Sequence, residues 1–236
     1  MPNTCDLADQ GRHNMHAADK DQLRQAYERA QTGVLVAEQR TRDRIDITGR
    51  DRMDLLDRIS TNSFKDKRHG DHQRTALLEA NGRLIDLLDV FVFEDRLILS
   101  ASAGSSETVK GWLDRHIFFQ DDASVELEKA WDKTIVVLGP HASKFLSGQI
   151  EDFTRIEKGS FLYKQDVFVL PLTWAKTSGY RLHLDRERAA RIISSAQQPI
   201  SQADAFAALE AHRIQAGIPR RGNEIVPGII PLEAGL

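Results

Sequence analysis

The chain has 236 residues, of which 41% are hydrophobic and 28% charged, a composition that suits a soluble globular protein of one large or two small domains. Its 35 acidic and 32 basic residues give a net charge of −3, which argues against a general attraction to nucleic acid. No apolar run approaches the roughly 20 residues that span a bilayer, and the lone cysteine, Cys5, cannot form an internal disulfide. We therefore expect a cytoplasmic protein that does not contact membranes.

The first stretch of the chain is polar and shows no periodicity. We expect residues 1–20 to form a disordered tail. His13 and His16 have the spacing of helical metal ligands, but no third ligand accompanies them, so we predict no metal site. The pattern then predicts a short helix over 21–31 and a strand over 33–37.

A strand and a helix are predicted next. Residues 44–49 alternate apolar and polar side chains, which indicates a half-exposed strand ending at Gly49. An apolar stripe predicts a helix over 50–60, and we interpret the polar residues 63–74 as a solvated loop. Basic residues gather here without interleaved aromatic residues, and we interpret them as a solvated surface: Arg40, Arg42, Arg44, Arg50 and Arg52.

The stretch 75–100 predicts a three-stranded antiparallel meander. Asn81 and Gly82 form the dipeptide that best tolerates a tight turn between two strands. Apolar runs lie on both sides of this turn, at 76–78 and 84–93. A polar break at Glu94 and Asp95 then leads into a third apolar run, 97–99.

Two acidic residues interrupt the apolar central strand of this meander. Asp86 and Asp89 are three positions apart, so the two-residue period of a strand places them on opposite faces. A buried carboxylate without a partner costs several kcal/mol. Two interpretations stay open: exposed positions on an edge strand, or the lining of a polar cavity.

The second half of the chain alternates short strands and helices. Helical spacing predicts helices over 105–119, 142–146, 186–196 and from Ser201 to about Gly217, with Ser201 and Asp204 as an N-cap pair. Strands are predicted over 124–128, 133–138, 166–172 and 180–184.

Frequent hairpins and the lack of a regular βαβ period favour an α+β fold. We predict two intertwined α/β blocks with mainly antiparallel sheets, 21–122 with the Asp86 hairpin and 123–236. Generic motifs disclose no chemistry, because the chain lacks a Walker A loop, a G-x-G-x-x-G turn, an H-E-x-x-H helix and paired cysteines.

Three stretches together resemble the folate-binding T-protein-like domains. The first reads IDITGRDRMDLL at 45–56, followed by ISTN at 59–62. The second is NGRLID at 81–86, and the third comprises RIQAGIP at 213–219, GNEI at 222–225 and IPLEAGL at 230–236. Their order and spacing match that superfamily from about Gly33 to the end of the chain.

Two branches of the superfamily are candidates: the aminomethyltransferase of the glycine cleavage system, and the YgfZ family of tetrahydrofolate-binding proteins implicated in iron–sulfur protein maintenance and tRNA modification. The transferase usually carries G-Y-T-G-E-D-G-[FY] where this chain has TWAKTSGY at 173–180, and its pterin-binding glutamate falls on Gln215. These departures favour the YgfZ-like branch. The K-G-C-Y-x-G-Q-E motif and the small C-terminal β-barrel of that family are not in this chain, so we expect a fragment or a shortened member.

The resemblance implies a folate site and assigns residues to it. It makes Asp86 the candidate catalytic and folate-binding residue, with Leu88 and Val90 as an apolar wall of the cavity. Three further candidate folate contacts follow from it: Ser100, Arg213 and Gln215.

Three functions follow from the resemblance. The first is a tetrahydrofolate-binding YgfZ-like protein with iron–sulfur client or assembly proteins as partners. The second is a tetrahydrofolate-dependent aminomethyltransferase or demethylase. The third is a folate-free protein-interaction scaffold.

Overall fold

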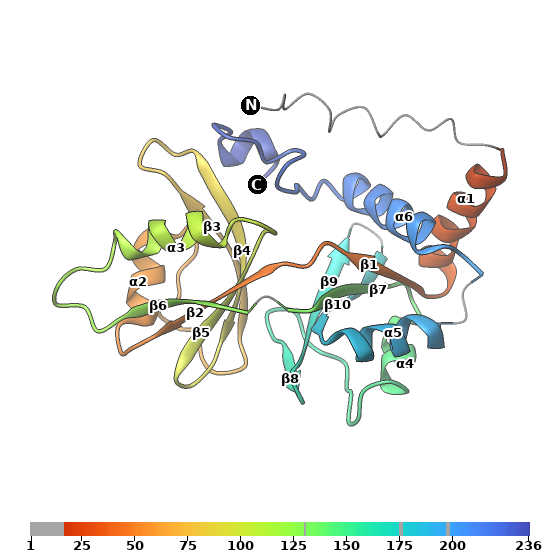
Figure 1. Ribbon diagram of the computed structural model, residues 1–236, viewed down its shortest axis with the longest axis horizontal. Helices are drawn as coiled ribbons and strands as arrows, with labels where there is room; N and C mark the ends of the chain where they lie inside the picture. Colours follow the sequence, from red (N-terminus) through yellow and green to blue (C-terminus); the bar gives the residue numbers. More distant parts are fainter. Residues whose placement is uncertain (1–16, 130, 175–176, 197–198) are drawn as a thin grey trace, which may run out of the picture.

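The computed structural model describes residues 17–129, 131–174, 177–196 and 199–236. Its strands form two five-stranded sheets in which all strand pairs are antiparallel, and helices cover both sheets (Figure 1). This architecture confirms the predicted α+β class with mainly antiparallel sheets.

The first sheet contains the predicted meander. Its strands run in the order β3 (His72–Leu78), β4 (Leu84–Val92), β5 (Arg96–Ala101), β2 (Asp43–Thr48) and β6 (Ser124–Glu128). Gly82 turns the chain between β3 and β4 with a φ of +81°, a conformation that glycine adopts without steric cost. Helices α2 (Arg52–Ile59) and α3 (Ser106–Asp114) cover the face of this sheet that points away from the second sheet (Figure 1).

β4 lies between β3 and β5, so the interpretation of its two aspartates as exposed residues of an edge strand is wrong. Asp86 is 0% exposed and Asp89 is 1% exposed. They occupy opposite faces, as the period of the strand requires. Leu88 and Val90 share the face of Asp86 and pack in the core under α2 and α3, whereas Asp89 faces the second sheet.

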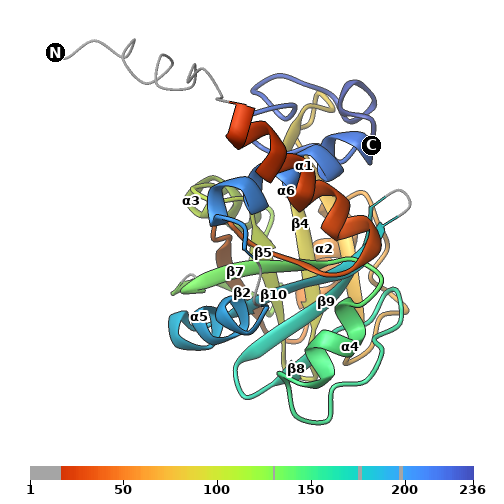
Figure 2. The same cartoon turned by 90° about the vertical axis from the view of Figure 1, so that its right-hand side faces the viewer.

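The second sheet runs in the order β1 (Leu35–Gln39), β7 (Lys133–Leu138), β10 (Thr177–Leu184), β9 (Val167–Trp174) and β8 (Leu162–Lys164). Helices α4 (Ala142–Ser147) and α5 (Arg186–Ser195) cover one face. Helices α1 (Ala17–Thr32) and α6 (Gln202–Gln215) cover part of the other face (Figure 2). The rest of that face is free to meet the first sheet.

An aromatic cluster joins the two sheets. Phe91 of β4 contacts Phe168 of β9 with ring centroids 5.2 Å apart, and Trp131 meets Phe168 edge-on at 5.6 Å. Phe93, Ile98 and Leu170 complete this buried cluster. Since such pairs bury large apolar areas, the cluster fixes the two sheets against each other beside the site described below.

The chain exchanges strands between the sheets. β1 precedes every strand of the first sheet but pairs with β7, and β6 pairs with β2 although it lies beyond residue 122. The two sheets are thus intertwined, and a division at 122/123 does not coincide with them.

The boundaries of several elements differ from the predictions. Helix α1 begins at Ala17, so the last residues of the expected 1–20 tail are helical, and residues 1–16 with His13 and His16 lie outside the described residues. Helix α3 ends at Asp114 rather than near 119, and strand β8 was not predicted. The loop expected over 63–74 ends at His72, where β3 begins.

A C-terminal segment, residues 216–236, leaves α6 and crosses above the junction of the two sheets (Figure 1). The amide of Leu84 donates to the carbonyl of Ile229 at 2.8 Å, and Ile225 packs with Ala76 and Leu84. A short 3₁₀ turn, η1 (Pro231–Ala234), follows. Across the described part of the chain, no helix combines the length and the apolar character needed to cross a membrane.

Candidate functional site

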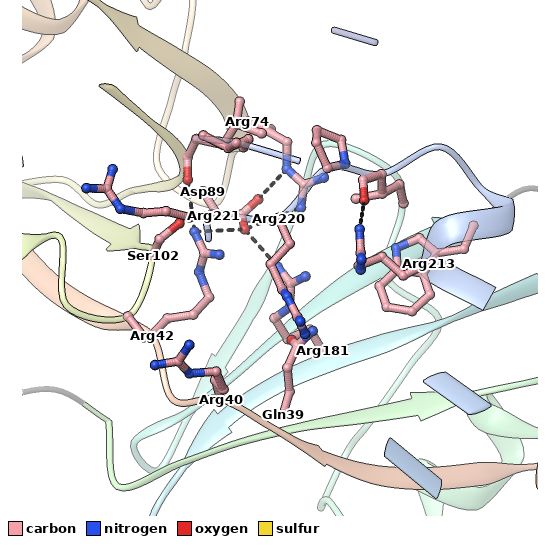
Figure 3. Close-up of a pocket in the computed structure, with 16 residues that line it drawn as sticks. Gln39, Arg40, Arg42, Arg74, Asp89, Ser102, Arg181, Arg213, Arg220 and Arg221 are labelled. Atoms are coloured by element: carbon pink, nitrogen blue, oxygen red, sulfur yellow. Dashed lines mark hydrogen bonds and ion pairs between the residues drawn. The ribbon is translucent and has the colours of Figure 1, made fainter. Parts of the chain in front are cut away.

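A pocket opens where the two sheets meet the C-terminal segment (Figure 3). Its walls come from the β1–β2 connection, β3, β4, the loop after β5, β9, β10, α6 and residues 218–225. It is open to solvent, and the roughly 790 Å³ of space between its walls includes that opening.

The lining of this pocket is strongly cationic. Of the residues that the structure describes, Asp89 is the one acidic residue that lines it, and an apolar part of the wall is built from Leu87, Trp174, Ile218, Pro219 and Ile225. Seven arginines complete the charged part of the wall: Arg40, Arg42, Arg74, Arg181, Arg213, Arg220 and Arg221.

Asp89 is held from several sides by basic side chains (Figure 3). Its Oδ1 accepts hydrogen bonds from His72 Nε2 at 3.0 Å and from Arg74 Nε at 3.1 Å. Its Oδ2 accepts from Arg181 Nη1 at 2.8 Å and from Arg74 Nη2 at 3.4 Å. A carboxylate offers about four lone-pair sites, so these contacts leave no acceptor of Asp89 for a ligand.

The charge state of Asp89 follows from these contacts. Burial by itself would raise the pKa of its carboxyl group, but the charge of Arg74, the hydrogen bond from His72 and the charge of Arg181 together hold that pKa well below its usual value. Asp89 is therefore an ionised counter-ion for the arginines.

For Arg181, unlike Asp89, the effect of burial on the pKa outweighs the attraction of its ionic partner. Burial lowers the pKa of its guanidinium to about 9, and repulsion from Arg42 and Arg74 adds to this, although Asp89 opposes both effects. The floor of the pocket thus carries more positive charge than Asp89 compensates.

Hydrogen bonds to residues of the first sheet hold the side chain of Arg42 in place. Its Nε donates to Ser100 Oγ at 2.8 Å, and its Nη2 donates to the carbonyl of Ser100 at 2.7 Å and to that of Leu87 at 3.0 Å. Ser100, a predicted folate contact, is fully buried and orients Arg42; it does not itself line the pocket.

Gln39 supplies an uncharged acceptor. It ends β1 and lines the pocket, and its Oε1 is buried with no hydrogen-bond partner among the described residues. Buried polar atoms are rarely left without a partner, so a ligand donor that reached this oxygen after a turn of the side chain would satisfy it.

Arg213, another predicted contact, lines the pocket but is already engaged. Its Nε donates to Glu210 at 3.0 Å, its Nη1 and Nη2 donate to Glu224 at 3.0 and 3.1 Å, and Nη1 also bonds the carbonyl of Ile218. Arg213 therefore ties the C-terminal segment to α6.

Asp86, the predicted catalytic residue, lies outside the pocket. Its carboxylate accepts hydrogen bonds from the amides of Leu87 and Ser102, each at 2.8 Å, and from the hydroxyls of Ser102 and Ser105 at 2.6 and 2.5 Å. The side chain points toward the start of α3 because of the strand period, and the pocket-facing neighbour is Leu87. These four hydrogen bonds tie Asp86 to the loop after β5 and to the start of α3.

The other predicted contacts are also not brought together. Leu88 and Val90 are fully buried under α2 and α3 and do not line the pocket. Gln215 is exposed at the end of α6, where its Oε1 accepts a hydrogen bond from the hydroxyl of Tyr27 at 2.6 Å. The pocket thus contains one of the six predicted site residues, Arg213.

Sequence reasoning missed the residues that define the site. His72 and Arg74 lie in the segment that was predicted to be a solvated loop. Arg40 and Arg42 belong to the basic residues that were predicted to form a solvated surface. Arg181 and Gln39 were not predicted to line a site. The signal that could have found Arg74 is its position in β3, directly opposite Asp89, since a buried strand carboxylate needs a cationic partner.

The chain is similar to known proteins over most of its length. A model of the GCVT N-terminal domain family matches residues 10–236. Aminomethyltransferases of Bacillus cereus (strain B4264) and of Bacillus anthracis are each 26% identical over 207 residues, which cover 81% of this chain and 55% of each relative. The chain thus spans about half the length of these curated relatives.

A solved structure shares the fold. The crystal structure of the glycine cleavage system aminomethyltransferase T from Bartonella henselae superposes with a TM-score of 0.75 at 18% sequence identity, covering 89% of this chain and 58% of that chain. The match confirms the two-sheet architecture predicted from the sequence. The chain belongs to the GCVT N-terminal domain family, within the T-protein superfamily that its motifs resemble.

Proposed function

We propose that the central pocket binds a reduced folate, tetrahydrofolate, and that the chain holds this ligand without transferring a one-carbon unit. The observation that carries this proposal is the contrast between an uncharged acceptor and a fully engaged carboxylate: among the described residues Gln39 Oε1 has no hydrogen-bond partner, whereas Asp89 accepts four hydrogen bonds.

The lining fits a folate chemically. A pterin presents amide and amino donors at one edge, which Gln39 Oε1 can accept. Trp174, Leu87 and Ile218 supply apolar surface for a flat ring system. When bound, tetrahydrofolate supplies an amine that can carry a one-carbon unit.

The same lining argues against transfer. The resemblance to the transferase implies that a carboxylate in contact with the folate amine orients it for attack, which is a positioning and electrostatic role. Asp86 lies on the other face of β4, Leu87 occupies the pocket-facing position beside it, and Asp89 is neutralised by Arg74 and Arg181. The chain's own residues thus support binding and positioning rather than chemistry.

The biological context that we propose is the YgfZ-like one, in which a folate-loaded protein supports iron–sulfur proteins or tRNA modification. The departures at 173–180 and at Gln215 support this branch. Loss of the gene should lower the activity of iron–sulfur enzymes or the content of modified tRNA, and unchanged levels of both would argue against this context.

Calorimetric titration of tetrahydrofolate, kept reduced, tests the binding proposal. We expect saturable binding to the wild-type chain and an affinity about tenfold lower for Gln39→Leu, because a hydrogen bond to a buried acceptor is lost while the volume is nearly kept. Gln31→Leu, an exposed residue on α1 outside the pocket, is the matched control and should bind like the wild type.

Two outcomes would change the conclusion. A well-folded chain that binds no tetrahydrofolate overturns the proposal and favours a folate-free scaffold. Formation of methylenetetrahydrofolate from an aminomethyl or N-methyl donor would instead support the aminomethyltransferase activity that the names of the Bacillus relatives suggest.

A further inference from the structure

The pocket lining holds more positive charge than the protein neutralises. Among the described residues, three carboxylates pair with five of its seven arginines. Asp89 pairs with Arg74 and Arg181 and, at 4.0 Å, with Arg42. Glu210 pairs with Arg213 and Arg220, and Glu224 pairs with Arg213. Among the described residues, the set therefore keeps a surplus of four positive charges.

Three of these arginines have nitrogens available to a ligand. Arg40 is exposed and has neither a hydrogen bond nor an ion pair among the described residues. Arg42 keeps its Nη1 free while Nε and Nη2 are fixed by Ser100 and by the carbonyl of Leu87. Arg221 bonds the carbonyl of Ile85 through Nη1, and no acidic residue of the described chain pairs with it.

The surplus is unfavourable without a ligand. Like charges that share a partly buried pocket repel one another, and burial removes much of the water that would screen them. Burial is the main cause that lowers the pKa of the Arg181 guanidinium, and the charges of Arg42 and Arg74 lower it further. A bound anion would relieve this repulsion.

We propose that Arg40, Arg42 and Arg221 form a seat for a multivalent oxyanion, a ligand group with two or more negative charges such as a pyrophosphate or a run of neighbouring carboxylates. Guanidinium groups form charge-assisted hydrogen bonds with phosphate and carboxylate oxygens, and Ser100 and Leu87 hold Arg42 so that, among the described residues, its Nη1 remains for such a bond. This site goes beyond folate binding as such, because it concerns a second, anionic group and stands whether or not the rest of the ligand is a folate.

Two sources could supply such a group, and titrations distinguish them. Inorganic pyrophosphate probes a phosphate group. Tetrahydrofolate with one glutamate and with three glutamates probes a carboxylate tail, since the two ligands differ only in the number of carboxylates. All titrations use the full chain, at low and at high NaCl.

We expect at least one of these probes to bind at Arg40, Arg42 and Arg221. Either pyrophosphate binds saturably, or the triglutamate binds more tightly than the monoglutamate, and this binding weakens as NaCl is raised. Arg40→Ala and Arg221→Ala should each lower the affinity for that probe about tenfold, as expected for loss of a charge-assisted hydrogen bond.

A control variant distinguishes binding at Arg40, Arg42 and Arg221 from a general attraction of anions to the arginines of the protein. Arg186→Ala removes an exposed arginine of α5 that lies outside the pocket, and it should leave the affinity unchanged. Arg40 has no protein partner, so its variant should fold like the wild type, which a thermal melt checks.

The outcomes also separate this proposal from the folate proposal. Pyrophosphate binding without any folate binding supports the seat and overturns the folate reading. Binding of tetrahydrofolate with no gain from extra glutamates and no pyrophosphate binding overturns the seat and leaves the folate reading intact. An equal loss in Arg40→Ala and Arg186→Ala would also overturn it, because general charge would then explain the attraction.

Discussion

Asp89 and His183 lie on facing strands of the two sheets, and both are buried. Asp89 is buried as a charged carboxylate and His183 as a neutral imidazole, so protonation at low pH changes the charge of each. Asp89 is held ionised by Arg74, His72 and Arg181. His183 is fully buried against Trp131, with ring centroids 4.2 Å apart. Its burial, together with the charge of Arg181, lowers its pKa well below the ordinary 6.5, so it is neutral. The stability of the protein therefore depends on pH through both of these groups.

The free energy of unfolding should fall in two steps as the pH is lowered. Both folded-state pKa values are depressed, so each contribution is present above the ordinary pKa and is lost as pH falls below it: first under 6.5 for His183, then under 3.8 for Asp89. Each group adds a slope of up to about 1.4 kcal/mol per pH unit. Urea unfolding across this range measures it.

One substitution at each group tests the two steps of the pH dependence individually. His183→Gln should flatten the first step, and Asp89→Asn should flatten the second while destabilising the protein at neutral pH, because Arg74 and Arg181 lose their counter-ion. An unchanged pH profile in both variants would contradict the assignment of these two groups.

Asp86 should matter for stability rather than for binding. Asp86→Ala removes the carboxylate that accepts hydrogen bonds from the amide and the hydroxyl of Ser102, which should cost about 3 kcal/mol. Chemical denaturation measures the loss, and Asp66→Ala, at an exposed residue with no hydrogen-bond partner among those described, is the control. A variant that keeps its stability but loses tetrahydrofolate binding would restore Asp86 to the site.

At the residue scale, the sequence predicted which face of β4 each aspartate occupies, but not which residues contact it. Period-two alternation placed Asp86 and Asp89 on opposite faces, and this is confirmed. Which face meets a cavity depends on residues far away in the chain, such as Arg181 on β10, and local periodicity carries no information about them.

At the scale of elements, β10 depends on one close approach. Gly179 lies so near β7 that an added Cβ would stand 2.2 Å from the carbonyl oxygen of Val137. Gly179→Ala should therefore force the two strands apart and cost about 1–3 kcal/mol, with a lower midpoint in thermal unfolding.

A second glycine provides the control for this change. Gly111 lies within α3, and an added Cβ there would meet nothing within 4 Å. Gly111→Ala should raise the stability, by up to about 1 kcal/mol, because alanine favours the helix. Equal effects of the two substitutions would mean that β10 can shift away from β7 at little cost.

Most elements could be predicted because their signals are local. The Asn81–Gly82 turn, the strand 133–138 and the N-cap of α6, where Ser201 Oγ accepts from the amide of Asp204 at 3.1 Å, follow from neighbouring residues. β8 is short and gains its place from pairing with β9, and the start of β3 is polar because it faces Asp89. Tertiary contacts decide such segments.

At the scale of the whole molecule, ion pairs hold the C-terminal segment over the pocket, and the pair of Glu224 with Arg213 is one of them. Glu224 receives two hydrogen bonds from the buried Arg213 and one from the amide of Arg220. Glu224→Ala should loosen residues 218–225 and raise their amide hydrogen exchange about tenfold, because local opening loses these contacts.

The control is an ion pair that holds no segment in place. Glu187 pairs with Arg191 on the surface of α5, with both side chains mostly exposed. Glu187→Ala should leave exchange in 218–225 unchanged. If Glu224→Ala also left it unchanged, the segment would be held by its apolar contacts, such as those of Ile225.

The exchange of strands between the sheets has a consequence for synthesis on the ribosome. The chain emerges in order, and β2 to β6 can pair with one another as soon as they are out, which completes the first sheet. β1 emerges before all of them but must wait for β7, which pairs Leu35 with Leu138, so its unpaired edge is the part of the nascent chain that a chaperone would need to shield.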